Sequence, residues 1–203
     1  MTPQTNVLFL REYFRNPLAI GSVVPDSQRC VKTLVKHVPF DSARIILEFG
    51  CASGTVTQEL MERKRDNTML ICFEKNPHFY EALKRTIRGP NVILSGGDVL
   101  RASRFLRFQG IPKGTVDCII STLPCSNLDY QSILRDSVMP WLKPGGLFVQ
   151  YMHVLSYLKG FSVAPVLSTY FASVQSDFVF SNIPPAIVYH CSVNGNQRLH
   201  ERE

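Results

Sequence analysis

The middle of the chain alternates short apolar runs with amphipathic stretches. The apolar runs cover residues 44–47, 69–73, 92–94, 116–120 and 147–152, and the main amphipathic stretches cover residues 56–63, 77–87 and 130–142. Short apolar runs suit buried strands, whereas apolar positions every three or four residues suit helices that lie on a sheet. The pattern therefore predicts an α/β fold with a mostly parallel sheet and helices on both faces.

Two further patterns lie near the ends of the chain. Residues 7–15 are amphipathic at helical spacing, and a second helix is expected to start after Asp26 or Ser27, either of which can cap it, and to end before Pro39. Residues 174–180 and 186–193 flank a short segment with two prolines, which favours an antiparallel hairpin at the edge of the sheet. Residues 194–203 are polar and are expected to fray.

Composition is consistent with one globular domain. The chain has 203 residues, of which 45% are hydrophobic and 19% charged, enough apolar surface for one core but little for two. We expect residues 1–40 to form a helical cap on a core of residues 41–203. No apolar stretch is long enough to span a bilayer and no signal peptide precedes the core, so we expect a cytoplasmic protein.

Charge and cysteine spacing add two constraints. The net charge of +6 allows a polyanionic partner, either a nucleic acid or an anionic lipid surface. The six cysteines are scattered without metal-ligand spacing, so we expect reduced structural thiols and no metal site.

The first candidate site is the turn after residues 44–47. Glu48 precedes Gly50, Ala52 and Gly54, and a helix is expected to start at Thr55 or just after it. Small residues at a strand-to-helix turn let the backbone approach a ligand, and the helix start offers free amides. A turn of this kind also occurs for packing reasons alone, so this feature does not decide the function.

Three later positions strengthen the binding-site interpretation. Glu74 ends the second predicted strand, where its carboxylate can accept the hydroxyls of a ribose. Asp98 follows the third, placed to accept from an adenine amino group beside the backbone amide of Val99. Ser121 follows the fourth strand at the same expected edge of the sheet. NAD is disfavoured because its Gly-x-Gly-x-x-Gly fingerprint is missing.

The order of these motifs resembles class I S-adenosylmethionine-dependent methyltransferases along nearly the whole chain. In that family the first turn is usually Glu-x-Gly-x-Gly-x-Gly, and Ala52 replaces the middle glycine here, which is tolerable if its φ is negative. The resemblance implies a Rossmann-like, seven-stranded sheet and S-adenosylmethionine as cofactor. The cofactor-binding residues that it implies are Ser22, Glu48, Gly50, Ala52, Gly54, Thr55, Glu74, Lys75, Asp98, Val99 and Ser121.

A closer resemblance is to bacterial membrane-associating phospholipid N-methyltransferases. It rests on residues 9–17 and 20–27, on Ser121 to Pro124, on residues 148–151 and on Asn182 to Ala186. It implies methylation of the amine of phosphatidylethanolamine by a protein that binds the membrane peripherally, on its inner face. The helix of residues 7–15, which contains Arg11 and Arg15, can lie on an anionic leaflet or simply pack on the core.

The methyl acceptor requires its own residues. An amine must be neutral and aligned with the methyl group, and aromatic faces suit the methylammonium product. Tyr13 and Tyr151 are candidates for that contact and His153 for proton removal, although each of the three suits a structural role as well.

Three other functions stay open at this point. Ribosomal RNA adenine dimethyltransferases share the fold, but they carry Asn-Pro-Pro-Tyr or Asn-Pro-Pro-Phe where this chain has Ser121 to Pro124. A second alternative is that the methyl acceptor is a small-molecule amine. The substitution at Ala52 also allows a binding module that has lost catalysis.

Overall fold

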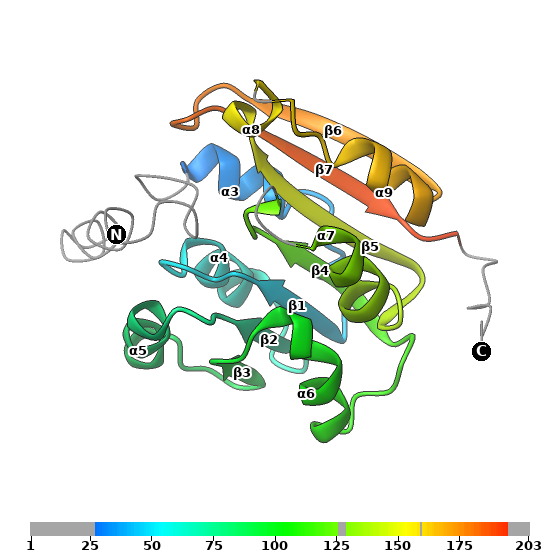
Figure 1. Ribbon diagram of the computed structural model, residues 1–203. Helices are drawn as coiled ribbons and strands as arrows, with labels where there is room; N and C mark the ends of the chain where they lie inside the picture. The colour runs from blue at the N-terminus through cyan, green and yellow to red at the C-terminus, as the bar shows by residue number, and fades with distance from the viewer. Residues whose placement is uncertain (1–26, 126–128, 159, 195–203) are drawn as a thin grey trace.

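The computed structural model describes residues 27–125, 129–158 and 160–194. They form one seven-stranded sheet with the order β3-β2-β1-β4-β5-β7-β6 (Figure 1). The strands are β1 (Ile45–Phe49), β2 (Met69–Phe73), β3 (Val92–Ser95), β4 (Val116–Ser121), β5 (Leu142–His153), β6 (Ser173–Val179) and β7 (Ala186–Ser192). Strands β1 to β5 are parallel, whereas β7 pairs antiparallel with both β5 and β6. The predicted α/β fold and the C-terminal hairpin are confirmed.

Helices cover both faces of this sheet. Their bounds are α3 (Gln28–Leu34), α4 (Thr55–Arg63), α5 (Pro77–Thr86), the 3-10 helix η1 (Val99–Arg101), α6 (Ala102–Phe108), α7 (Tyr130–Ser132), the π-helix η3 (Ile133–Val138), α8 (Val154–Leu158) and α9 (Ala164–Tyr170). Apolar side chains of α3, α4 and α5 pack on one face, and those of α6, η3 and α9 pack on the other. The sheet is thus buried on both sides, which explains the uninterrupted apolar runs of its central strands.

The start of α3 agrees with the sequence prediction. The Ser27 side chain accepts from the Cys30 amide at 3.2 Å and caps the helix. The helix ends at Leu34, and a turn leads from there to Pro39. None of the described helices is long and apolar enough to cross a membrane.

The segment 130–142 departs from its prediction as a single helix. Only Tyr130–Ser132 is α-helical, Ile133–Val138 is a π-helix, and β5 already begins at Leu142. Pro140 has no amide hydrogen and disfavours helix in the residue before it, so the helix cannot continue to Leu142. The early part of β5 pairs with Val116 across a register shift, which the apolar pattern alone does not show.

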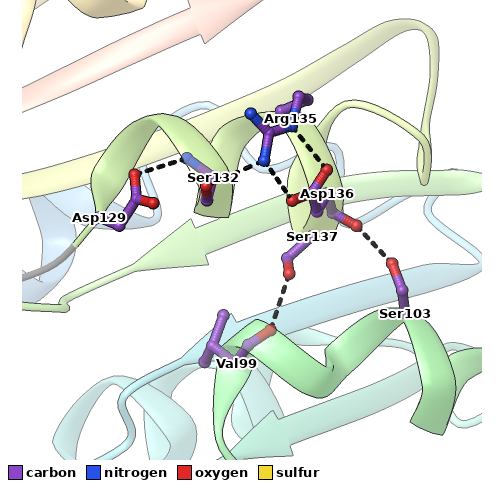
Figure 2. Close-up of polar contacts among 7 residues, drawn as sticks. All are labelled: Val99, Ser103, Asp129, Ser132, Arg135, Asp136 and Ser137. Atoms are coloured by element: carbon purple, nitrogen blue, oxygen red, sulfur yellow. Dashed lines mark hydrogen bonds and ion pairs between the residues drawn. The ribbon is translucent and has the colours of Figure 1, made fainter.

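Two hydrogen bonds tie η3 to the segment that follows β3. The Ser137 hydroxyl donates to the Val99 carbonyl at 2.7 Å, and the Ser103 hydroxyl donates to the Asp136 carbonyl (Figure 2). Ser137 is fully buried, so its bond is protected from water. The residues next to Asp98 are therefore held by η3, which packs on the same face of the sheet as η1 and α6.

Candidate functional site

The predicted glycine turn connects β1 to α4 at the carboxyl edge of the parallel strands. Gly50 and Gly54 have φ values of +84° and +79°, a conformation that favours glycine. A Cβ added at Gly50 would lie 3.0 Å from a methyl carbon of Leu123, and one at Gly54 would lie 2.7 Å from Leu83. Both positions thus require glycine for conformation and for space. The turn brings its backbone close to the loop after β4.

Ala52 differs from the expectation for it. Its φ is +45°, so its backbone is in the left-handed conformation and does not have the negative φ that the sequence analysis expected. This conformation is less stable for an L-residue by about 1–2 kcal/mol. In return the Ala52 amide donates to Glu74 Oε2 at 2.7 Å. The conformation of this residue therefore links the first turn to the end of β2.

Glu74 lies at the end of β2, where a carboxylate that could bind a ribose was predicted. Its other oxygen, Oε1, accepts from the Asn76 amide at 2.8 Å, so two backbone amides hold the carboxylate in one orientation. Burial raises the pKa of Glu74, and these two amides and nearby Lys75 partly offset that effect. Each carboxylate oxygen has a second lone pair, and so both can still accept a hydroxyl of a ligand.

Asp98 caps η1, because its carboxylate accepts from the Leu100 amide at 3.0 Å. The Lys75 ammonium lies 3.4 Å from its other oxygen, in an ion pair that water largely surrounds. A mainly apolar hollow adjoins Asp98, lined by Phe73, Ser95, Gly97, Asp98, Arg101, Arg104, Phe105 and Phe108. A flat purine suits such a hollow, with Asp98 at its polar rim. The arrangement fits the predicted adenine contact.

Glu48 is the most unusual ionisable group of the site. It is fully buried in β1, and its Oε1 atom has no hydrogen-bond partner among the described residues. Burial raises the pKa of its carboxyl to about 7, although the thiol of Cys72, 3.6 Å from Oε2, and the nearby Thr57 hydroxyl favour the charged form. Buried carboxyls with displaced pKa values are frequent at functional sites, and this one lies directly before the glycine turn.

The loop after β4 closes the same edge of the sheet. Ser121 is buried without a hydrogen-bond partner for its hydroxyl among the described residues, while Thr122 donates to the Gly50 carbonyl at 2.5 Å. The fully buried Gln150 of β5 donates to the Leu123 carbonyl at 3.3 Å. The end of β5 is therefore connected to the glycine turn through this loop.

A buried polar network occupies the end of β5. The Tyr151 hydroxyl lies 3.0 Å from His153 Nδ1, and Asn182 Nδ2 donates to the same hydroxyl at 3.0 Å. Asn182 Oδ1 accepts from the Ser27 amide at 2.8 Å, so the network reaches the start of α3. Burial lowers the pKa of His153 to about 4, which keeps its imidazole neutral at pH 7.

The structure thus places most of the predicted site residues on one edge of the sheet. Thr55 begins α4, where its hydroxyl lies 2.9 Å from that of Ser53, and Val99 is buried at the start of η1. Tyr13 and Ser22 lie outside the described residues. The contact between Asn182 and Tyr151 was not predicted, because the position of Asn182 two residues before a proline gives no sign of it.

Comparisons with known proteins agree with this geometry. No family model matches the sequence. The chain is 29% identical over 187 residues to the ornithine lipid N-methyltransferase of Singulisphaera acidiphila, an alignment that covers 91% of this chain and 94% of that protein. It is also 29% identical over 108 residues to the ribosomal RNA small subunit methyltransferase A of Thermotoga petrophila, but this covers 53% of the chain and 37% of the relative.

Solved structures give the fold independently. The S-adenosylmethionine-dependent O-methyltransferase of Thermotoga maritima superposes with a TM-score of 0.63 at 14% identity, covering 94% of this chain and 72% of that one. The chain has the class I methyltransferase fold. The precorrin-6y C5,15-methyltransferase of Geobacter metallireducens superposes with a TM-score of 0.60 at 16% identity, covering 83% and 89%. Fold and sequence relatives together support a methyltransferase enzyme, and they imply S-adenosylmethionine as its cofactor.

Proposed function

We propose that this protein transfers a methyl group from S-adenosylmethionine to the amine of a membrane-lipid headgroup. The observation that carries the proposal is the match to an ornithine lipid N-methyltransferase, which covers 91% of this chain and 94% of that protein. The partial match to a ribosomal RNA methyltransferase spans only about half of the chain. A lipid amine is therefore preferred over RNA as the acceptor.

Two lipid headgroups need to be compared. The sequence resemblance implies phosphatidylethanolamine, whereas the relative is named for ornithine lipid. Ethanolamine and ornithine both carry a primary amine, so one methyl-transfer site suits either of them. They differ in the neighbouring anion, which is a phosphodiester in one lipid and a carboxylate in the other.

An exposed apolar rim lies at the edge of the sheet that holds the site. Leu158 of α8 is 73% exposed, and Phe180 and Ile183 of the β6–β7 turn are 80% and 75% exposed. Helix α8 follows β5 directly and β7 pairs antiparallel with β5, which places both segments near the Tyr151 end (Figure 1). Apolar side chains of this kind suit contact with acyl chains.

Basic residues accompany the apolar rim. Helix α3 packs beside β6 and exposes Arg29 and Lys32, and the turn after the helix exposes Lys36. A basic face beside apolar side chains suits the anionic surface of a bilayer. The described residues thus support a peripheral membrane contact, which the sequence analysis had assigned to the helix of residues 7–15.

In this proposal the glycine turn and the acidic residues after β2 and β3 hold the cofactor. Glu74 would bind the ribose, Asp98 the adenine, and the amides after Gly50 the remaining polar groups. S-adenosylmethionine supplies an electrophilic methyl group on a sulfonium. Methyl transfer forms a carbon–nitrogen bond, breaks a carbon–sulfur bond and leaves an ammonium that has one proton to lose.

Tyr151 orients the acceptor amine. Asn182 donates to the Tyr151 oxygen, and the Tyr151 proton can be donated to His153. The remaining lone pair of the Tyr151 oxygen can then accept an N–H of an incoming amine, which leaves the nitrogen lone pair free to face the methyl group. His153, with a pKa near 4, is too weak a base to deprotonate an alkylammonium of pKa about 10, a mismatch of about 8 kcal/mol. We therefore assign His153 a positioning role. The reactive neutral amine arises by desolvation and loss of its proton to water.

The test is methyl transfer from radiolabelled S-adenosylmethionine to anionic vesicles that contain either phosphatidylethanolamine or ornithine lipid. Ribosomal RNA and free ornithine serve as parallel acceptors. Label in one of the two lipids supports the proposal and identifies the headgroup. Label in RNA or free amine alone, or in no acceptor although the protein binds the cofactor, overturns it.

A variant tests the assigned role of Tyr151. Tyr151→Phe should lower kcat about 100-fold, the typical contribution of a positioned polar group, with unchanged affinity for S-adenosylmethionine. Tyr170→Phe, which removes a hydroxyl from α9, is the matched control. Equal kcat values for both variants would remove Tyr151 from the acceptor site.

A further inference from the structure

Three potential metal ligands outside the glycine turn meet where α3 packs on the β6–β7 hairpin. They are His37, three residues after the end of α3, Asp177 of β6 and His190 of β7. One donor atom from each lies within 4.8 Å of the others. His190 Nε2 is 3.2 Å from Asp177 Oδ2, and the rings of His37 and His190 are perpendicular, with centroids 4.7 Å apart. No sequence spacing links these residues.

His190 lacks the hydrogen bonds that a buried imidazole requires. Its side chain is only 4% exposed, and neither ring nitrogen makes a hydrogen bond within the described part of the chain. Asp177 is near enough to Nε2, but the contact lacks hydrogen-bond geometry. A buried polar group without a partner is uncommon and calls for an explanation such as a bound ion.

We propose that His37, Asp177 and His190 bind a divalent transition-metal ion of the zinc class. Two imidazoles and one carboxylate are common ligands of zinc, at about 2.0–2.2 Å from the metal. Tetrahedral ligands at such distances lie about 3.4 Å from one another, close to the 3.2 Å between His190 and Asp177. His37 is exposed and can complete the group by a side-chain rotation. Water takes the fourth position on the solvent side.

Lys36 is the main feature that opposes binding. Its ammonium lies 3.4 Å from the same Asp177 oxygen and would repel a cation there. The Lys36 side chain is 54% exposed, so it can turn into solvent at little cost when a metal replaces it. Removing this charge should therefore strengthen binding.

The metal would fasten α3 to the hairpin. The start of α3 is already bound to the hairpin through the Ser27 amide and Asn182. A metal at His37 would hold its other end. An ion that binds only the folded chain stabilises it, so zinc should raise the thermal stability of the protein. This site stands apart from methyl transfer and does not rest on the proposed function.

The experiment uses the full chain, without an affinity tag, in a zinc titration followed by calorimetry and by thermal unfolding. We expect one equivalent to bind, and zinc at 100 times its Kd to raise Tm by about 5–10 °C. His37→Ala and Asp177→Asn should each weaken zinc binding at least tenfold, and Lys36→Met should tighten it. His78→Ala, which removes an exposed imidazole from α5, is the matched control and should change nothing.

Cobalt substitution separates this site from the buried cysteines. Ligation by nitrogen and oxygen gives weak visible bands, whereas thiolate ligation adds strong sulfur-to-cobalt absorption in the near ultraviolet. Strong sulfur bands, equal weakening by His78→Ala, or unchanged affinity in His37→Ala and Asp177→Asn would each overturn the proposal. Since no step uses a lipid or the methyl donor, the result is independent of the methyltransferase assay.

Discussion

Replacing Glu48 by glutamine should make the stability of this protein less dependent on pH. The carboxyl is fully buried, and burial raises its pKa from 4.5 to about 7 in the folded chain. The unfolded chain releases this proton near pH 4.5, whereas the folded chain retains it up to about pH 7. The folded state therefore binds more protons than the unfolded state in this window, and its stability falls as the pH rises.

The size of the effect follows from the two pKa values. One pKa unit corresponds to about 1.4 kcal/mol, so the ionised carboxyl lowers the free energy of unfolding by about 3 kcal/mol at pH 8 and by almost nothing at pH 4. Glutamine carries no charge at either pH. Glu48→Gln should thus gain up to about 3 kcal/mol relative to the unmodified protein between these limits. A difference in packing between glutamine and glutamate changes the free energy of unfolding equally at pH 4 and pH 8, so it does not alter the expected dependence on pH.

Urea unfolding at several pH values between 4 and 8 measures the difference. Glu62→Gln is the matched control, since Glu62 is exposed on the neighbouring helix α4. The stability difference between Glu48→Gln and the unmodified protein should grow with pH, while the difference for Glu62→Gln stays flat. Parallel curves for all three proteins would refute the assigned burial of an ionisable carboxyl. A group that costs stability at neutral pH is expected to serve binding, so cofactor affinity should fall in Glu48→Gln.

Three other predictions concern the glycine turn, the cofactor contacts and the N-terminal segment, whose residues 7–15 lie outside the described part of the chain. Ala52→Gly should raise the free energy of unfolding by about 0.5 kcal/mol in urea denaturation, because relief at positive φ exceeds the entropy cost of glycine; destabilisation would contradict it. Glu74→Ala and Asp98→Ala should each weaken S-adenosylmethionine binding about tenfold in calorimetry, and unchanged affinity in both would remove the site. Joint Arg11→Glu and Arg15→Glu substitution should weaken binding to anionic vesicles without changing cofactor affinity; equal vesicle binding would assign that helix a structural role.

Much of the fold could be predicted because its local and global signals agree. The strand β2 was predicted with the bounds that the structure has, and Ser27, one of the two predicted caps, is the cap of α3. The helices α6, α8 and α9 were missed. Each of the three has only five to seven residues, too few for a clear helical period, and their packing on the sheet stabilises them.

The cofactor side of the site was likewise accessible from sequence. Parallel strands meet at one carboxyl edge, so Glu74 and Asp98 could be assigned to neighbouring positions before any contact was known. The conformation of Ala52 could not be predicted, because the surrounding turn imposes its positive φ and the hydrogen bond to Glu74 stabilises it.

The sequence by itself determined the order of the strands along the chain, the helices α3, α4 and α5, the glycine turn and the acidic residues at the strand ends. These features depend on periodicity and on spacing within short segments, which the chain carries locally. Only the tertiary structure decided that Asn182 contacts Tyr151, that Glu48 is sealed from water, and that His37 meets Asp177 and His190. Contacts of this kind join residues up to 155 positions apart, and they exist only once the sheet has assembled.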